Sequence, residues 1–178
     1  MARQLRIDYP GATYHVYSRG NQKQAIFLAE EDYFYFLKIL GDAYDRFGVV
    51  FLACCLMPNH YHLMVQALSG GCSKVMHLIN TSYSIYLNKK RSRCGHLFQG
   101  RFKSILIEAD AYAYELSRYI HLNPVRAGLV RLPEDLPLSS YREFTGLREP
   151  RPWLDTSFVT GTIEMRDEEN IGAYSRYV

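Results

Sequence analysis

Two segments of the chain, 13–19 and 101–107, alternate apolar and polar residues with the two-residue period of a β-strand. A third segment, 49–57, is almost wholly apolar, and a fourth segment, 60–66, follows it closely. Pro58 and Asn59 separate these last two segments and are a typical turn pair, so we expect the segments to form a hairpin. The pattern therefore predicts four strands.

Three other segments carry apolar residues three and four positions apart, as amphipathic helices do. They span residues 30–47, which end before Gly48, residues 73–90, and residues 110–123, which end before Pro124. The order is strand, helix, strand, strand, helix, strand and a further helix. It predicts an α+β protein with a ferredoxin-like βαββαβ antiparallel sheet and one additional helix. Because many functions share this fold, function has to be argued from side chains.

The composition is that of an ordinary globular protein, with 178 residues, 48% hydrophobic and 22% charged, and it fits one domain. Four prolines after Leu132 predict a largely irregular C-terminal stretch. No apolar run approaches the roughly 18 residues of a membrane span, so we expect no membrane partner. The first residues carry no secretion signal, and the four cysteines lack the paired spacing of zinc sites. We therefore expect reduced thiols and a cytoplasmic protein.

Charge is segregated along the sequence, although the formal net charge is only +3. No acidic residue occurs between Asp45 and Glu108, whereas seven basic residues fall between positions 47 and 107. Such a run predicts a face that binds a polyanion, with merely solvated loop cations as the alternative. The residues that we expect to bind this polyanion are Lys89, Lys90, Arg91, Arg93, Arg101 and Lys103.

Two histidines occupy alternate positions at the start of the fourth predicted segment, 60–66. Residues i and i+2 of a strand point to one face, so His60 and His62 are expected to project together while Tyr61 points the other way. Two adjacent imidazoles can hold one divalent metal ion. The alternative is a pair of unconnected histidines, which is the commoner case for an isolated His-x-His.

The last predicted helix carries Tyr119 and Asn123, which are one turn apart and so share a face. The side-chain carbonyl of Asn123 could serve as a third metal ligand. The phenolic oxygen of Tyr119 could attack phosphorus beside that metal, because a divalent ion neutralises charge on phosphate oxygens. From spacing alone, a core tyrosine and an asparagine that caps the helix end are the favoured interpretations.

At these residues the chain resembles the REP-associated tyrosine transposases. These enzymes belong to the single-tyrosine HUH (His–hydrophobic–His) class of DNA-nicking enzymes. The resemblance rests on three motifs in order, Pro-Asn-His-Tyr-His-Leu at 58–63, Gly-His-Leu-Phe-Gln-Gly-Arg-Phe-Lys-Ser at 95–104, and Tyr-Ile-His-Leu-Asn-Pro-Val-Arg-Ala-Gly at 119–128. It extends from about Pro10 to Gly146.

The resemblance implies a metal-dependent endonuclease and strand transferase that acts on single-stranded or hairpin DNA. Its implied metal ligands are His60, His62 and Asn123, with Mg²⁺ or Mn²⁺ as the metal, although related insertion-sequence transposases have Gln in place of Asn123. It makes Tyr119 the nucleophile, which would form a 5′-phosphotyrosine intermediate. It also implies a catalytic domain over residues 1–146 with a C-terminal extension over 147–178. Both a homodimer and a monomer stay open, because insertion-sequence relatives act as dimers whereas proteins nearer this family can be monomers.

Two other functions stay open at this point. A catalytically idle nucleic-acid-binding module could use the same scaffold, although the aromatic signature of the RNA recognition motif is absent. A metal-dependent phosphodiesterase could use water in place of Tyr119. A covalent protein–DNA adduct distinguishes the transposase from both.

Overall fold

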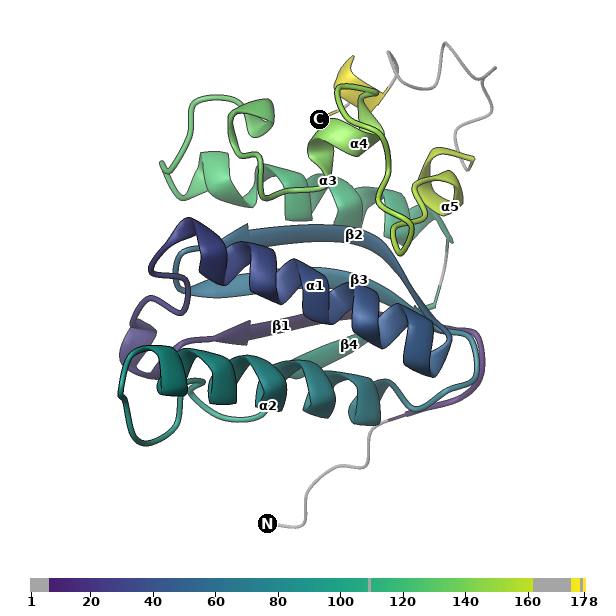
Figure 1. Cartoon of the computed structure of the whole chain (residues 1–178). Helices are drawn as coiled ribbons and strands as arrows, with labels where there is room; N and C mark the ends of the chain where they lie inside the picture. Colours follow the sequence, from purple (N-terminus) through teal and green to yellow (C-terminus); the bar gives the residue numbers. More distant parts are fainter. Residues whose placement is uncertain (1–6, 109, 162–173, 177) are drawn as a thin grey trace.

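The four strands form one antiparallel sheet in the order β2-β3-β1-β4 (Figure 1). The structure is a computed structural model that describes residues 7–108, 110–161, 174–176 and 178. The elements that build the sheet and its helices are β1 (Ala12–Arg19), α1 (Glu30–Phe47), β2 (Val49–Met57), β3 (His60–Ala67), α2 (Cys72–Lys90), β4 (Lys103–Ile107) and α3 (Asp110–Arg126). The predicted α+β, ferredoxin-like fold is therefore confirmed.

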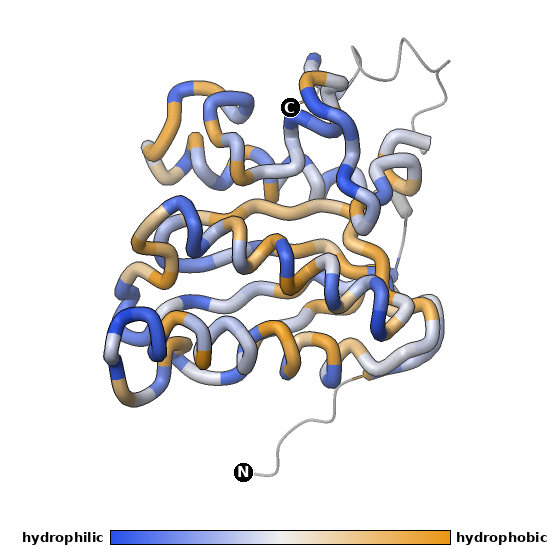
Figure 2. Tube along the Cα trace, viewed as in Figure 1, coloured by the Kyte–Doolittle hydropathy of each residue, from blue (hydrophilic) through white to orange (hydrophobic). Residues whose placement is uncertain are grey.

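Helices α1 and α2 lie side by side over one face of the sheet (Figure 1). Alternate strand residues such as Val16, Tyr61 and Leu63 point into this layer and are fully buried. Hydrophobic residues recur along the strands and these two helices, whereas the end of α2 is largely hydrophilic (Figure 2). Burial of this alternating set fixes the register of the strands, because a slip by one residue would turn every apolar side chain to the other face.

The start of α1 is held by a buried carboxylate. Asp32 accepts hydrogen bonds from the backbone N–H groups of Leu28 and Ala29, both at 3.0 Å, and so satisfies donors that the helix itself leaves unpaired. The helix ends at Gly48, whose φ of 59° lies in the left-handed region that glycine adopts without steric conflict.

Helix α3 covers the opposite face together with the C-terminal segment. Its residues Leu116 and Ile120 pack with Leu52 and Met64 of the sheet and with Phe144 in a second apolar cluster. The C-terminal segment contains a short 3₁₀ turn (Pro133–Asp135), α4 (Tyr141–Phe144) and α5 (Ser157–Thr160), and another 3₁₀ turn (Asn21–Lys23) follows β1. No helix of the described residues is long and apolar enough to cross a membrane.

Helix α3 continues through Pro124, so the predicted end at residue 123 is wrong. Proline has no N–H and removes one helical hydrogen bond. The side chain of Asn123 also bonds within the helix, because its Nδ2 donates to the carbonyl of Tyr119 at 2.9 Å, but this is not the carbonyl of Ile120 to which an N–H at position 124 would donate. The chain leaves the helical path at Gly128, where φ is 67°. The fourth strand also begins two residues later than predicted, at Lys103.

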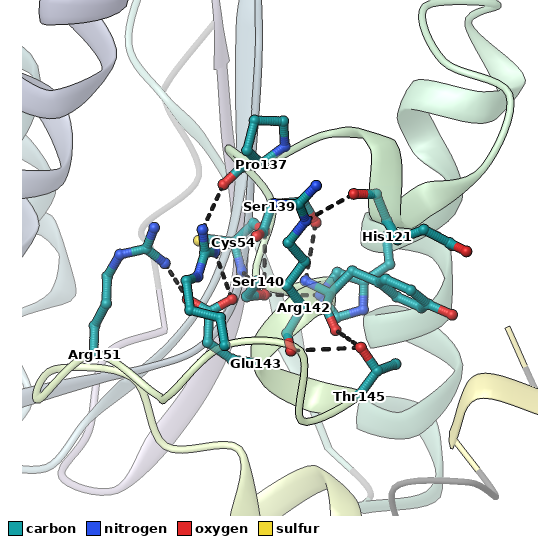
Figure 3. A network of polar contacts seen from close by, with 12 residues as sticks. Cys54, His121, Pro137, Ser139, Ser140, Arg142, Glu143, Thr145 and Arg151 are labelled. Atoms are coloured by element: carbon teal, nitrogen blue, oxygen red, sulfur yellow. Dashed lines mark hydrogen bonds and ion pairs between the residues drawn. The ribbon is translucent and has the colours of Figure 1, made fainter.

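Residues after Gly146 pack onto the sheet although their sequence is irregular. Trp153 meets Phe51 edge to face, with ring centroids 5.5 Å apart, and Leu154 forms an isolated bridge with Phe51. The buried carboxylate of Glu143 pairs with Arg148 at 2.6 Å and also with Arg151 (Figure 3). The division of the chain at Gly146 stays a prediction, and residues 162–173 of the predicted extension lie outside the described residues.

Candidate active site

Strand β3 places His60 and His62 on the face that α3 shares, as predicted. Their ring centroids are 5.2 Å apart and the rings are nearly perpendicular. His60 is half-buried and His62 is buried, whereas Tyr61 points to the other face and donates a hydrogen bond to Asn80 at 2.7 Å. Across the ladder, Arg19 of β1 pairs with His60 and Tyr17 pairs with His62.

Helix α3 brings Tyr119 against these histidines. The Tyr119 ring meets His62 edge to face at 5.8 Å between centroids and meets His15 of β1 in the same way at 6.0 Å. The guanidinium carbon of Arg126 lies 5.7 Å from the centroid of the Tyr119 ring. Tyr119 keeps 39% of its surface exposed, so its hydroxyl-bearing ring is accessible to a large substrate.

Two cavities meet at this point. One, of about 630 Å³, contains the predicted ligand set and is lined by Tyr17, Ser18, Arg19, His60, His62, Gln99, Gly100, Arg101, Lys103, Tyr119 and Asn123. The second, of about 540 Å³, is lined partly by His15, His62, Glu115, Arg118, Tyr119 and Arg126. Tyr17, His62 and Tyr119 line both cavities and therefore lie where the two cavities adjoin.

In both imidazoles, the ring nitrogen that takes part in a hydrogen bond is Nδ1. Nδ1 of His60 lies 2.6 Å from Oδ1 of Asn59, and Nδ1 of His62 lies 2.9 Å from Nε2 of His15. Within the described parts of the chain, neither Nε2 has a hydrogen-bond partner. The amide of Asn123 uses its Nδ2 to bond the Tyr119 carbonyl, which leaves Oδ1 as the oxygen available to a cation.

Burial favours the neutral form of these histidines. It lowers the pKa of His62 to about 3, with a further decrease from His15, His60 and Arg19 nearby. Burial also lowers the pKa of His15 to about 4, and burial together with Arg19 lowers the pKa of His60. The imidazoles are therefore uncharged at neutral pH, which is the form that binds metals.

The described residues contain no group of three or more His, Cys, Asp or Glu side chains that could hold a metal ion. Two imidazole nitrogens and one amide oxygen are what the site offers, so a bound cation would complete its coordination with water or substrate oxygens. The amide oxygen and the waters are ligands that Mg²⁺ and Mn²⁺ accept, whereas the two imidazole nitrogens also suit metals such as Zn²⁺.

The structure separates the six predicted DNA-binding residues into two groups. Arg101 and Lys103 line the cavity of the histidines. The others, Lys89, Lys90, Arg91 and Arg93, lie at the end of α2, which Figure 1 places at the same end of the molecule as the turn between β2 and β3.

Two residues of the second group already have a buried partner. Lys90 and Arg91 pair with Asp32 at 2.7 and 3.3 Å, and the Asp32 side chain is fully buried. Arg93 donates to Gln24 at 3.2 Å. Burial of Asp32 acts to raise its pKa, but the hydrogen bonds from Lys90, Leu28 and Arg91 outweigh burial and lower the pKa to about 2.

Sequence reasoning missed three residues of the site, all on β1. His15, Tyr17 and Arg19 alternate along the strand and so share the face of His60 and His62. Their alternation was visible in the sequence, but the pairing of β1 with β3, which brings them beside the histidines, depends on the register of the sheet.

The fold and the paired histidines beside a helix-borne tyrosine agree with the class of protein that comparison with known proteins identifies. The family described as "Transposase IS200 like" matches residues 8–123, more than half of the chain. The chain therefore belongs to this transposase family.

Two relatives narrow the likeness to REP-associated tyrosine transposases, as the sequence motifs predicted. A Haemophilus influenzae protein described as a "Putative REP-associated tyrosine transposase" is 27% identical over 114 residues, covering 57% of this chain and 65% of that relative. The chain thus matches somewhat less than two thirds of the relative's length. A solved structure of a REP-associated tyrosine transposase bound to a REP hairpin has a TM-score of 0.72 and 18% identity over 82% of this chain and 86% of that one, and it confirms the fold.

Proposed function

We propose that this chain is a metal-dependent endonuclease and strand transferase for single-stranded DNA, with Tyr119 as its nucleophile. The observation that supports this most directly is the contact between Tyr119 and His62, which come from separate elements yet meet with ring centroids 5.8 Å apart. Both line one cavity with His60 and Asn123. A core tyrosine would be buried, whereas this one is partly exposed at the junction of two cavities.

The proposed metal ligands are Nε2 of His60, Nε2 of His62 and Oδ1 of Asn123, the three donor atoms that the surrounding hydrogen bonds leave available. A bound Mg²⁺ or Mn²⁺ would withdraw charge from the oxygens of the scissile phosphate. The protein itself would position the phosphate against Tyr119, since the two ligand-bearing strand positions and the nucleophile-bearing helix are fixed by the packed core.

The proposed substrate is single-stranded or hairpin DNA, and the solved relative is bound to a REP hairpin. Arg19, Arg101 and Lys103 line the cavity and would contact phosphates there. Lys89 and Arg93 would extend this path along the end of α2. Lys90 and Arg91, which already pair with Asp32, would act mainly through the positive field and by holding that end of the helix.

In the proposed step, the phenolic oxygen of Tyr119 forms a bond to phosphorus while the bond from phosphorus to the 3′ oxygen breaks. The phenol gives up its proton and the 3′ oxygen takes one up. The products are a 5′-phosphotyrosine link and a free 3′-hydroxyl. Because one phosphoester replaces another, a 3′-hydroxyl can reverse the step and join strands without an external energy source.

The test is adduct formation on end-labelled hairpin oligonucleotides with single-stranded flanks, incubated with the protein and Mn²⁺ and separated on a denaturing gel. The Tyr119→Phe variant, which removes one oxygen, should bind DNA but form no adduct, and His60→Ala or His62→Ala should not cleave. Tyr112→Phe is the matched control, because Tyr112 is exposed on the same helix and lines the neighbouring cavity. It should keep the adduct.

Peptide mapping of the adduct identifies the linked residue. A link to a tyrosine other than Tyr119 would overturn the site assignment. Cleavage without an adduct by the Tyr119→Phe variant would instead show that water is the nucleophile and that the chain is a phosphodiesterase.

A further inference from the structure

We propose that His15 and Asn59 are positioning residues that present Nε2 of His62 and of His60 to the metal ion. This inference rests on the proposed function, because it concerns the same pair of ligands. The motif that predicted the ligands assigns no role to His15, and it contains Asn59 only as a turn residue. Each side chain bonds Nδ1 of one ligand histidine, and that bond decides which ring nitrogen is free to bind a cation.

The direction of the bond to His60 follows from the amide of Asn59. Its Nδ2 donates to the carbonyl of Lys23 at 3.1 Å, which identifies the other amide atom, 2.6 Å from His60, as Oδ1. An amide oxygen only accepts, so Nδ1 of His60 must carry the proton. In the neutral ring, Nε2 then holds the free electron pair and can bind a metal.

The bond to His62 has two possible directions, and only one is compatible with a metal. If His15 donates from its Nε2, the proton of His62 sits on Nε2 and blocks coordination. If Nδ1 of His62 donates to His15, Nε2 of His62 is free. Metal binding at His62 therefore requires His15 to accept, and His15 would keep its own proton on Nδ1.

The surroundings of His15 hold its ring in place for this role. His15 lies on β1 with only 6% of its surface exposed, and its ring centroid is 5.2 Å from that of His62 and 5.2 Å from that of Tyr17. The planes of the His15 and His62 rings are inclined by 21° and the rings are stacked. Because β1 and β3 are adjacent strands, the hydrogen bond between these rings links the two strands. A partner this rigid fixes the orientation of the ligand ring as well as its tautomer.

The experiment measures Mn²⁺ affinity of the full chain by electron paramagnetic resonance titration, without DNA. His15→Phe keeps an aromatic ring at this position but removes the nitrogen that accepts the hydrogen bond from His62. It should weaken Mn²⁺ binding by about 10- to 100-fold, the range typical of the loss of a residue that hydrogen-bonds a metal ligand. His15→Gln can place its side-chain oxygen near the original Nε2 and should recover most of the affinity. Asn59→Asp retains the acceptor and should bind Mn²⁺ well, whereas Asn59→Leu should not.

Tyr112→Phe is the matched control, because Tyr112 lines the same cavity as His15 and His62 but forms no hydrogen bond with either proposed ligand ring. It should leave the affinity unchanged, and thermal unfolding without metal should report whether any variant has lost its fold. A second measurement, long-range ¹H–¹⁵N correlation of the histidine rings with Mg²⁺ present, should find the proton of His62 on Nδ1 in the wild type.

The outcomes separate this inference from the proposed function. Mn²⁺ binding that depends on His62 but is equal in wild type and a folded His15→Phe variant would overturn the positioning role and leave the proposed function standing. Wild-type protein whose Mn²⁺ binding is unaffected by His62→Ala would overturn both. Loss in His15→Phe with recovery in His15→Gln supports the inference.

Discussion

Three cations line the cavity of the paired histidines, and their removal should change how DNA binding depends on salt. Arg19, Arg101 and Lys103 come from β1, from the loop before β4 and from β4 itself. Each phosphate contact to single-stranded DNA releases condensed counterions and adds about 0.7 to the slope of log affinity against log salt. Conversion of all three residues to glutamine should therefore reduce the magnitude of the slope by about 2.

This slope has a large effect over an ordinary salt range. Between 50 and 200 mM salt, a change of about 2 in slope corresponds to about a 20-fold difference in how far affinity falls. Fluorescence anisotropy with a labelled single-stranded oligonucleotide, in Tyr119→Phe protein so that no covalent product forms, gives the affinity at each salt concentration. The loss should be similar for unrelated sequences, because phosphate contacts carry no sequence information.

A second triple variant, with Lys38, Arg46 and Lys74 converted to glutamine, makes the same change in net charge. These residues lie on α1 and at the start of α2, and none of them lines either cavity near the histidines. Their removal should change the slope by much less than 2. If both triple variants change the slope equally, the cavity does not hold the DNA backbone and the effect belongs to net charge alone.

Two further predictions concern stability and use urea denaturation. Lys90→Met should lower the free energy of unfolding, because it removes one partner of the fully buried Asp32 carboxylate while the other partner, Arg91, remains; an unchanged free energy of unfolding would show that the pair of Lys90 with Asp32 does not stabilise the fold. Burial lowers the pKa of His121 to about 3, so between this pH and the usual 6.5 the unfolded chain binds a proton that the folded chain does not. Stability from His121 is thus complete above pH 6.5 and falls as the pH decreases toward 3, by up to about 1.4 kcal/mol per pH unit, and His121→Gln should reduce this slope between pH 4 and 6. An identical pH slope in a folded His121→Gln variant would refute this assignment.

The strands of the sheet could be predicted from the sequence because the alternation of apolar residues and the turn residues that mark them lie within short segments. Segments 49–57 and 60–66 flank a two-residue turn, and their apolar residues fill the core, so the hairpin follows from neighbours in the chain. The parity of His60 and His62 is likewise a property of one strand. The predicted C-terminal end of α3 was wrong because Pro124 lies inside the helix. The free-energy cost of an internal proline is offset by the packing of α3 against the sheet and the C-terminal segment, which the helix sequence alone does not reveal.

The remainder of the site depends on contacts between distant segments. The partner of Lys90 and Arg91 is Asp32, which lies 58 residues before Lys90 in the chain, so a count of charges along the sequence did not show that two predicted DNA contacts are paired. The bond between His15 and His62 joins residues 47 positions apart. The pairs of Asp32 and the bond between His15 and His62 form only once the strands and helices have packed together.

The placement of Tyr119 itself depends on the C-terminal segment. Two residues after Tyr119, His121 lies roughly 200° further around α3 and is fully buried, while Tyr119 faces the cavity. Nε2 of His121 bonds Ser140 at 2.7 Å, and Ser140 in turn exchanges hydrogen bonds with the backbone of Cys54 in β2 (Figure 3). These bonds fix the rotation of α3 about its axis relative to the sheet. The proposed nucleophile and the two proposed histidine ligands are therefore held in position by a polar connection on the opposite side of the helix, and residues around Ser140 would contribute to the geometry of a reaction that they do not contact.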